Sequence, residues 1–353
     1  MSTLSRRERI SRRKNIRAVI AAILAIAVLS AFFIYDYRHN SDWYSHDDIV
    51  MGTVVSVKLK GQNNKAVAND IVMLLRNLEY KRLSWRVADT YLAKINAKAG
   101  TGSFEPDEET LGYIKDTLEI CEASGGALDI SLGELTRLWD FDSGENKVPP
   151  SEEINYFLPF VNFRNIKIED KAVSVGQDQA IDMGAVGKGI ACDEAYKLLK
   201  GKPTKSAIIS VGGSVLLYNT GDVKVGIRKP DGAANEYMGI LTLKNCNIST
   251  SGNYEKAFEQ DGKKYHHILD PKTGYPVDNN LTSVTVVCKD GLMADALSTA
   301  CFVLGYEKSL ELLDNYNAKA VFISKDGSVR ATHDLDKKLT LTDSNYRLVG
   351  AEG

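Results

Sequence analysis

The stretch Tyr265–Pro276, YHHILDPKTGYP, concentrates more chemically active and turn-forming residues than any other part of the chain. Two adjacent histidines precede the turn dipeptides Asp270-Pro271 and Thr273-Gly274. Because a residue before proline is disfavoured in helical geometry, we expect the histidines to end a short strand or to enter a rigid loop. Rigid loops commonly present functional groups. Taken alone, the stretch also fits a tight turn with two surface histidines.

The composition is that of an ordinary globular protein with a substantial core. The chain has 353 residues, of which 44% are hydrophobic and 25% charged, enough for one large domain or two ordinary ones. The net charge of −2 and the lack of a long basic stripe beyond the N-terminus argue against a nucleic-acid partner. Five scattered cysteines without C-x-x-C spacing predict buried free thiols rather than a zinc site or a disulfide framework: Cys121, Cys192, Cys246, Cys288 and Cys301.

The N-terminus carries a membrane signal. Residues 1–17 are rich in arginine and lysine, and residues 18–35 are uncharged and mostly apolar. At about 1.5 Å per residue this run nearly spans a bilayer core, and Tyr35, Tyr37 and Trp43 fit the far interface. A cleaved signal peptide is the alternative, because Ala25-Ile26-Ala27 resembles a cleavage site. Since the apolar run continues past it, we predict an uncleaved single-pass anchor.

Charge asymmetry around the anchor sets the expected topology. Residues 1–17 should remain in the cytoplasm, because basic segments are retained on that side of the membrane. Residues 36–48 are expected to form a polar spacer, and residues 49–345 a catalytic body outside the cytoplasm.

The rest of the chain predicts an α+β body with mixed or antiparallel sheets and flanking helices. Alternating β-branched residues indicate strands, and apolar residues at helical spacing indicate helices. We expect single strands at 49–59 (with Gly52 as a break), 223–227, 238–243, 246–250 and 283–288. We expect strand pairs within 166–175, within 208–218 around Gly212-Gly213, and at 320–324 and 328–332, which turn at Asp326-Gly327. We expect helices at 65–83, 92–99, 108–123, 191–199, 292–304 and 306–316.

Asp295 and Thr299 are suited to binding a metal ion. They stand four residues apart on a predicted helix, so both project from one face. A carboxylate and a hydroxyl are hard oxygen ligands of the kind Mg²⁺ accepts beside waters or phosphates. The same spacing also fits an aspartate that stabilises the helix N-terminus beside a threonine that packs inward.

The segment 182–189, DMGAVGKG, is suited to contacting a phosphate. Its three glycines permit close backbone approach, N–H groups at a helix start bind anions, and Lys188 adds a positive charge. It is not a Walker A loop, because it lacks the four-residue spacer and the hydroxyl residue after the lysine. A phosphate-contacting turn and a plain strand-to-helix connection both remain open.

Seven segments, in order, resemble the motifs of the ApbE family of flavin transferases, which are FAD:protein FMN transferases. They are MGT (51–53), SGGALDISLGELTRLWDF (124–141), IDMGAVGKG (181–189), SVGGS (210–214), STSGNYEK (249–256), HHILDPKTGYP (266–276) and ADALSTA (294–300). They extend over residues 50–305, and the chain is identified as a member of that family. The resemblance implies a single ApbE-like domain, related to the T-fold.

The resemblance also implies a reaction and a set of site residues. FAD would be cleaved at its pyrophosphate, with FMN passing to a Ser or Thr hydroxyl of a partner flavoprotein and AMP leaving. Mg²⁺ would be held by Asp295, Thr299 and the backbone carbonyl of Ala185. His267, selected over His266 by its spacing to Asp270-Pro271, matches the proposed general base, and Lys188 would stabilise developing charge. The positions that match the FAD site are Met51, Trp85 (often tyrosine in the family), Ala127, Leu128, Asp129, Asp182, Lys188 and Ile268.

The acceptor is expected to be another polypeptide, with the motif D-x-x-S/T-x-A-S/T. Subunits of membrane redox pumps and extracellular electron-transfer flavoproteins are the candidates by family analogy. Residues 295–301 resemble this motif but end in Cys301, so self-modification is not expected. Three alternatives remain: an Mg²⁺-dependent FAD pyrophosphatase that gives FMN and AMP, a non-catalytic membrane-tethered flavin-binding protein, and a structural surface protein. The last two leave His267, Lys188, Asp295 and Thr299 without a role.

Overall fold

A computed structural model describes residues 43–230, 232–233 and 235–350 of the chain. Its centre is a nine-stranded sheet in the order β1-β2-β6-β7-β10-β13-β14-β15-β17. All neighbouring strands are antiparallel except β15 and β17, which are parallel. The strands are β1 (Tyr44–Val50), β2 (Thr53–Gly61), β6 (Thr204–Val211), β7 (Ser214–Tyr218), β10 (Asn247–Gly252), β13 (Leu281–Cys288), β14 (Lys319–Ser324), β15 (Ser328–Ala331) and β17 (Arg347–Leu348).

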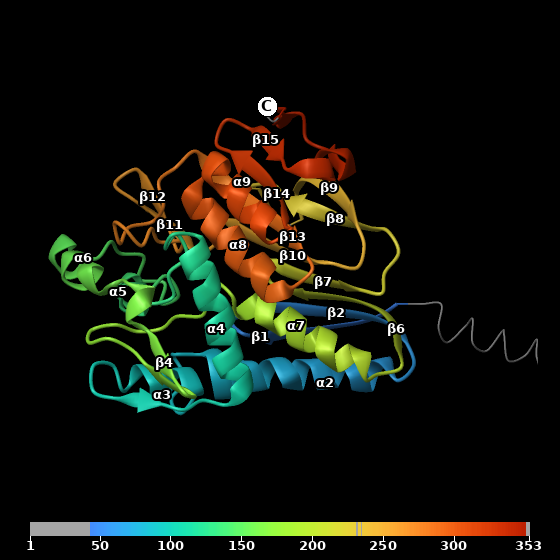
Figure 1. The fold of residues 1–353 in the computed structure, drawn as a ribbon. Coiled ribbons are helices and arrows are strands. Elements are labelled where there is room, and N and C mark those ends of the chain that lie inside the picture. Colours follow the sequence, from blue (N-terminus) through green and yellow to red (C-terminus); the bar gives the residue numbers. More distant parts are fainter. Residues whose placement is uncertain (1–42, 231, 234, 351–353) are drawn as a thin grey trace, which may run out of the picture.

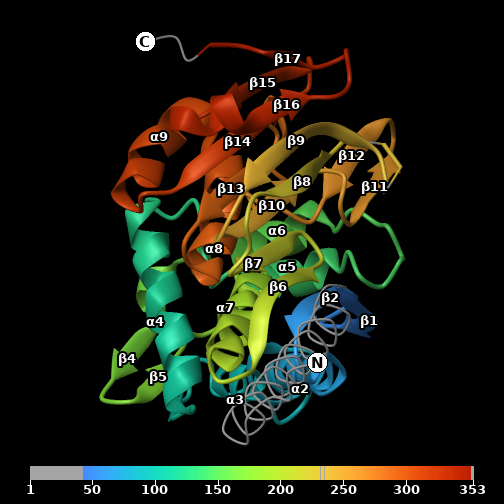
Figure 2. The same ribbon diagram turned by 90° about the vertical axis from the view of Figure 1, so that its right-hand side faces the viewer.

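Helices cover one face of this sheet and a second sheet covers part of the other, as Figure 1 shows for β10, β13 and β14. The covering helices are α2 (Asn64–Asn77), α7 (Gly187–Lys200), α8 (Gly291–Leu304) and α9 (Tyr306–Asn315), and α4 (Glu108–Ala123) packs against α8. The second sheet consists of β8 (Val223–Arg228), β9 (Tyr237–Leu243) and β16 (Leu339–Leu341), in the order β16-β9-β8. Strand β13 is buried on both faces because it lies between these two layers, and the same layering is visible from the side in Figure 2.

A smaller group of elements packs beside the end of the sheet where the histidine stretch lies. It contains α5 (Gly133–Trp139), α6 (Ser151–Phe157) and the hairpin β11 (Ala257–Gln260) to β12 (Lys263–His266). Their common core is aromatic and aliphatic, with Trp139, Ile154, Phe258 and Leu269 buried together. In Figure 1 these elements lie to one side of α4 and α8.

Short elements complete the described chain. They are η1 (a π-helical turn, Leu78–Leu83), α3 (Tyr91–Asn96), η2 (Leu158–Phe160), η3 (Phe163–Asn165), η4 (His333–Lys338) and the small sheet β3 (Ser103–Phe104), β4 (Lys167–Glu169) and β5 (Ala172–Ser174), ordered β3-β5-β4.

The expected α+β architecture with mixed sheets and flanking helices is confirmed, but several boundaries differ, and three of the differences bear on the site or on the extent of the body. The strand expected at 49–59 is a hairpin that turns at Met51-Gly52, so β1 begins at Tyr44 and takes in part of the expected spacer 36–48. Most of β1 was not predicted because its residues are largely polar. An edge strand of this kind is held by hydrogen bonds to its neighbouring strand and has no apolar pattern of its own. The helix expected from residue 191 begins at Gly187, and β17 extends the body beyond residue 345.

The predicted basic segment (1–17) and anchor (18–35) lie outside the described residues. Within the described ranges, no helix is long and apolar enough to cross a membrane.

Candidate active site

Two adjoining pockets lie where α7, α8, the histidine stretch and the β1–β2 turn meet. The inner pocket, of about 190 Å³, reaches Asp295, His267 and Asp129, and the outer pocket, of about 740 Å³, reaches Met51 and Trp85. The two share a wall that we call the neck, formed by Arg86, Asp142, Asp182, Gly184, Lys188, Glu255 and Lys256.

Every residue predicted for the site lines one or both pockets. The inner pocket contains Ala127, Leu128, Asp129, Ala185, His267, Ile268, Asp295 and Thr299, the outer pocket contains Met51 and Trp85, and Asp182 and Lys188 belong to both. The structure therefore brings together residues that are separated by up to 248 positions in the sequence, from Met51 to Thr299.

A close backbone contact between the starts of α7 and α8 places the glycine-rich segment 182–189 beside Asp295. A side chain at Gly189 would overlap the carbonyl oxygen of Gly291, and a side chain at Gly291 would overlap that of Gly189. Only glycine at both positions allows α7 and α8 to approach so closely. Consequently Ala185 and Lys188, at the start of α7, line the same inner pocket as Asp295.

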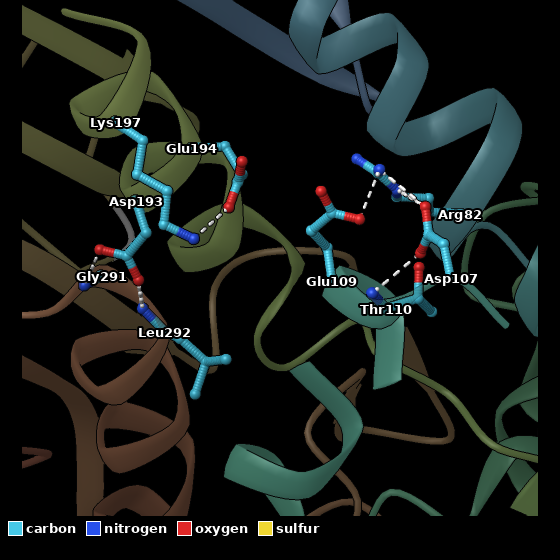
Figure 3. A network of polar contacts seen from close by, with 9 residues as sticks. All are labelled: Arg82, Asp107, Glu109, Thr110, Asp193, Glu194, Lys197, Gly291 and Leu292. Atoms are coloured by element: carbon cyan, nitrogen blue, oxygen red, sulfur yellow. Dashed lines mark hydrogen bonds and ion pairs between the residues drawn. The ribbon is translucent and has the colours of Figure 1, made fainter. Parts of the chain in front are cut away.

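The start of α8 is held by a carboxylate from α7. Asp193 accepts hydrogen bonds from the backbone N–H groups of Gly291 (2.6 Å) and Leu292 (2.8 Å), as Figure 3 shows. The residue before the helix, Asp290, makes no side-chain cap of its own. A carboxylate at a helix N-terminus is favoured by the orphan N–H groups and the helix dipole, although burial raises the pKa of Asp193 to about 6.

A second group of ion pairs in Figure 3 fixes the segment that leads to Trp85. Arg82, at the end of η1, lies 2.7 Å from Asp107 and 3.3 Å from Glu109. Asp107 also caps α4 through the backbone N–H of Thr110, at 3.0 Å. The loop after η1 is thereby tied to the start of α4.

Asp295 is buried, with 3% of its surface exposed, and both of its carboxylate oxygens accept hydrogen bonds. Its Oδ1 accepts from the hydroxyls of Ser249 (2.5 Å) and Ser214 (3.2 Å), and its Oδ2 accepts from the backbone N–H of Gly189 (2.9 Å). These partners belong to β10, β7 and α7, so the carboxylate does not simply cap its own helix. Among the described residues no cation pairs with it, and buried charges are normally paired or bound to metal.

The donor set around Asp295 fits a magnesium ion that retains other oxygen ligands. Thr299 lies one turn further along α8, with its hydroxyl 3.1 Å from that of Ser251. The N–H of Gly189, four residues after Ala185, donates to Asp295 and not to the Ala185 carbonyl, which therefore takes no part in the first turn of α7. One carboxylate, one hydroxyl and one carbonyl match the few protein ligands that Mg²⁺ takes beside substrate phosphates and water. The described residues contain no cluster of three or more His, Cys, Asp or Glu able to hold a metal.

The two histidines have different environments. His266 ends β12 and is buried; its Nε2–H donates to the carbonyl of Val277 (3.0 Å), and its Nδ1 accepts from the N–H of Ile268 (3.3 Å). His267 is half-buried and donates from Nδ1 to the carbonyl of Glu255 (3.0 Å). Because a carbonyl only accepts, the neutral His267 ring has Nε2 as its acceptor nitrogen. His266 is thus a structural residue, and His267 is the one suited to act as a base.

Burial lowers the pKa of both imidazoles. The pKa of His267 falls to about 3, with the positive charge of Lys188 as a second cause, and that of His266 falls to about 4. Removing a histidine from water disfavours its charged form, so both rings are neutral at physiological pH.

The histidine stretch is a rigid loop, as its turn dipeptides predict. The N–H of Gly274 donates to the carbonyl of Asp270 (2.8 Å), and the N–H of Asp270 donates to the carbonyl of Tyr275 (2.8 Å). The indole of Trp139 then donates to the carbonyl of Gly274 at 2.8 Å. Gly274 has a φ of 72°, and a side chain there would collide with Ile154.

Three of the predicted flavin-site residues also hold the site together. Asp129 accepts from the N–H (2.8 Å) and hydroxyl (2.6 Å) of Ser131 and from the N–H of Phe163 (3.0 Å), while burial raises its pKa. Met51, with a φ of 56°, donates its N–H to Glu79 at 2.8 Å. Trp85 lies under the guanidinium groups of Arg86 (4.1 Å) and Arg137 (4.9 Å), and its buried indole nitrogen has no hydrogen-bond partner among the described residues.

Four charged residues of the neck, Arg86, Asp142, Glu255 and Lys256, are absent from the predicted site residues. Arg86 directly follows Trp85, Asp142 directly follows the segment 124–141, and Glu255 and Lys256 end the segment 249–256. The sequence could have indicated these four residues only through their position in or beside the predicted segments. Ion pairs between distant loops leave no periodic pattern that a sequence would reveal.

The fold and the site together define a class of protein. A fixed carboxylate, a hydroxyl, a lysine and a neutral histidine converge in a cleft at two helix starts, in an α+β body. Such an arrangement is suited to binding phosphate groups, with a base beside them.

The chain belongs to the ApbE family, whose model matches residues 51–322. It is 32% identical over 330 residues to the FAD:protein FMN transferase of Treponema pallidum, covering 86% of this chain and 91% of that protein. It is 30% identical over 310 residues to the FAD:protein FMN transferase of Klebsiella pneumoniae, covering 87% and 97%.

Solved structures of the family have the same fold. The ApbE protein of Thermotoga maritima superimposes with a TM-score of 0.78 at 30% identity, over 84% of this chain and 99% of that one. The flavin transferase ApbE of Vibrio cholerae gives a TM-score of 0.75 at 25% identity, over 84% and 99%.

Proposed function

We propose that this protein is an FAD:protein FMN transferase that requires Mg²⁺. One observation carries the proposal: Asp295, Thr299 and Ala185 line the same pocket as Lys188 and the half-buried His267. The match to this chain covers 91% and 97% of the two relatives named as FAD:protein FMN transferases. This coverage supports the same reaction here.

In the proposed reaction a Ser or Thr hydroxyl of the acceptor attacks the phosphorus on the FMN side of the pyrophosphate. A new P–O bond to the acceptor forms, the P–O bond to AMP breaks, and AMP leaves with the bridging oxygen. His267 takes the hydroxyl proton at Nε2 while Nδ1–H remains bonded to Glu255, which fixes the direction of the ring. Lys188 stabilises the charge that develops on the phosphate oxygens.

Asp295, Thr299 and the Ala185 carbonyl would hold the magnesium ion. When bound, Mg²⁺ would supply charge neutralisation at the pyrophosphate. The hydroxyls of Ser214 and Ser249 donate to Asp295 and keep its carboxylate oriented toward the proposed metal site.

The acceptor is proposed to be a separate flavoprotein with the motif D-x-x-S/T-x-A-S/T. A test combines purified full-length protein, FAD, Mg²⁺ and an acceptor domain carrying this motif, followed by denaturing electrophoresis. Flavin fluorescence on the acceptor band, dependent on Mg²⁺, is the expected result. Release of free FMN and AMP without a fluorescent band would instead identify the FAD pyrophosphatase, and intact FAD would contradict both reactions.

We also propose that the protein is held in the cell membrane by residues 18–35, with its catalytic body outside the cytoplasm. The uncharged run and the basic residues before it support this topology. Added protease should then digest the catalytic body in cells whose outer layers have been removed but whose cell membrane is intact. Protection of the body until the membrane is lysed would contradict the proposed orientation.

A further inference from the structure

Three charged side chains from distant segments meet at the neck between the pockets. Arg86 lies 2.6 Å from one carboxylate oxygen of Asp142, and Lys256 lies 2.6 Å from the other. Arg86 follows η1, Asp142 follows α5, and Lys256 follows β10. We call this group the clasp. Its side chains are 45%, 34% and 50% exposed, so a ligand in the pockets can reach all three.

The clasp is part of a mixed set of charges. Three cations (Arg86, Lys188 and Lys256) and three anions (Asp142, Asp182 and Glu255) line the neck. Asp182 accepts from the N–H of Gly184 at 2.8 Å and shapes the turn before α7. Lys188 forms no ion pair with another described residue. Asp142 is therefore the anion that engages two of the cations at once.

We propose that Arg86 and Lys256 form a subsite for the pyrophosphate of FAD, and that Asp142 competes with the pyrophosphate for both cations. The inference rests on the proposed function. FAD consists of two ring systems joined by a pyrophosphate, and the neck joins two pockets. A molecule that occupies both pockets has its pyrophosphate at the neck, with Lys188 on the same wall.

A pyrophosphate can replace Asp142 as the anion bound to Arg86 and Lys256. Asp142 offers one oxygen to each cation, as two phosphate oxygens would, and arginine and lysine bind phosphate and carboxylate oxygens by the same charge-assisted hydrogen bonds. Arg86 is also held over the Trp85 ring, so it stays in place when its anion changes. Entry of the pyrophosphate releases Asp142, and with it the contact between the loop after α5 and the other two segments.

The test measures binding of FAD and of riboflavin, which lacks phosphate, to the purified full-length protein by flavin fluorescence. Asp142→Asn removes the competing charge, so FAD should bind about three- to tenfold more tightly. Arg86→Gln and Lys256→Gln each remove a phosphate contact, so FAD should bind about tenfold more weakly. Riboflavin affinity should be unchanged in Asp142→Asn and Lys256→Gln. Arg86 also covers the Trp85 ring, so the comparison with riboflavin rests on the other two variants.

A matched control and a competitor make the outcome decisive. Glu122→Gln breaks the Arg164–Glu122 pair, which is 2.7 Å apart, more exposed than the clasp and outside both pockets, and it should leave FAD affinity unchanged. Inorganic pyrophosphate should compete with FAD more effectively in Asp142→Asn than in the unmodified protein. The proposal is overturned if Asp142→Asn binds FAD no more tightly, or if riboflavin affinity changes in parallel with FAD affinity in Asp142→Asn or Lys256→Gln.

The same variants separate this inference from the proposed function. Flavin on the acceptor band together with unshifted FAD affinities overturns the pyrophosphate subsite and leaves the transferase intact. Shifted FAD affinities without covalent flavin support the subsite and count against the transferase.

Discussion

At the scale of single residues, the adjacent histidines provide a direct test of the base. His267→Gln keeps a donor for the Glu255 carbonyl but cannot accept a proton. We expect transfer to slow by about 10²- to 10⁴-fold, with FAD affinity unchanged, because a positioned base contributes a factor of that order. His266→Gln is the matched control: it should retain transfer but unfold more easily, since His266 uses both ring nitrogens inside the protein. A His267→Gln protein with full transferase activity would exclude this residue as the base.

The lowered pKa of His267 predicts an unusual pH profile. A base is active in its deprotonated form, and that form is lost as the pH falls through about 3. As far as His267 is concerned, kcat/KM for FAD should therefore be flat from pH 8 down to pH 5, because this parameter reports pKa values of the free enzyme. A fall in activity centred near pH 6.5, absent from His267→Gln, would show that its pKa is not lowered.

Thr299 tests the proposed magnesium site. Thr299→Val removes the hydroxyl while preserving shape, and Thr299→Ser preserves the hydroxyl. We expect Thr299→Val to need about tenfold more Mg²⁺ for half-maximal transfer and Thr299→Ser to behave like the unmodified protein, since loss of one contact at a metal site costs about that factor. The measurement is the transfer rate as a function of Mg²⁺ concentration, and equal curves for both variants would remove Thr299 from the ligand set.

At the scale of elements, the start of α8 depends on a side chain from another helix. Asp193→Ala leaves the N–H groups of Gly291 and Leu292 without their acceptor. We expect the free energy of unfolding to fall by about 1–2 kcal/mol, as for the loss of a helix cap. We also expect a higher Mg²⁺ concentration to be needed for half-maximal transfer, because Asp295 is on the same helix. Denaturant unfolding measures the first effect. Unchanged stability would show that the cap contributes nothing.

The elements also show which parts of the fold a sequence can predict. Helix α4 was predicted with its observed bounds, 108–123, and the structure adds that Asp107 caps its start. The β6–β7 and β14–β15 hairpins were predicted from their glycine turns. By contrast, β1 and the β11–β12 hairpin carry polar residues and are held by cross-strand hydrogen bonds. Nothing in a local pattern reveals that β2 (Thr53–Gly61) pairs with β6 (Thr204–Val211), which lies far away in the sequence.

The site follows the same division. Positions inside the family motifs, such as Asp295 and His267, were located from the resemblance, and the structure places them on the two pockets. The clasp was not predicted, because Arg86, Asp142 and Lys256 come from three loops whose contact depends on the packing of η1, α5 and β10. The hydrogen bonds that assign His266 to structure and His267 to the pocket likewise appear only in three dimensions.

At the scale of the whole molecule, buried ionisable groups make stability depend on pH in opposing ways. The pKa of His266 is lowered from 6.5 to about 4, so the unfolded chain takes up this proton first. The stability contributed by neutral His266 is present above pH 6.5 and is lost as the pH falls toward 4. The pKa of Asp193 is raised from 3.8 to about 6, so ionisation of this carboxyl costs folding free energy above pH 6, and that cost disappears as the pH falls toward 3.8.

Variants at these two positions should therefore change the pH dependence of unfolding in opposite directions. One proton taken up on unfolding corresponds to about 1.4 kcal/mol per pH unit. Between pH 6 and about pH 4.5, His266→Gln should flatten the decline of unfolding free energy by up to this amount, and Asp193→Asn should steepen it by a comparable amount. Denaturant titrations at several pH values measure both slopes against the unmodified protein. Because each comparison is a change in slope, a uniform loss of stability caused by either substitution does not affect it, and parallel slopes in all three proteins would contradict the burial of both groups.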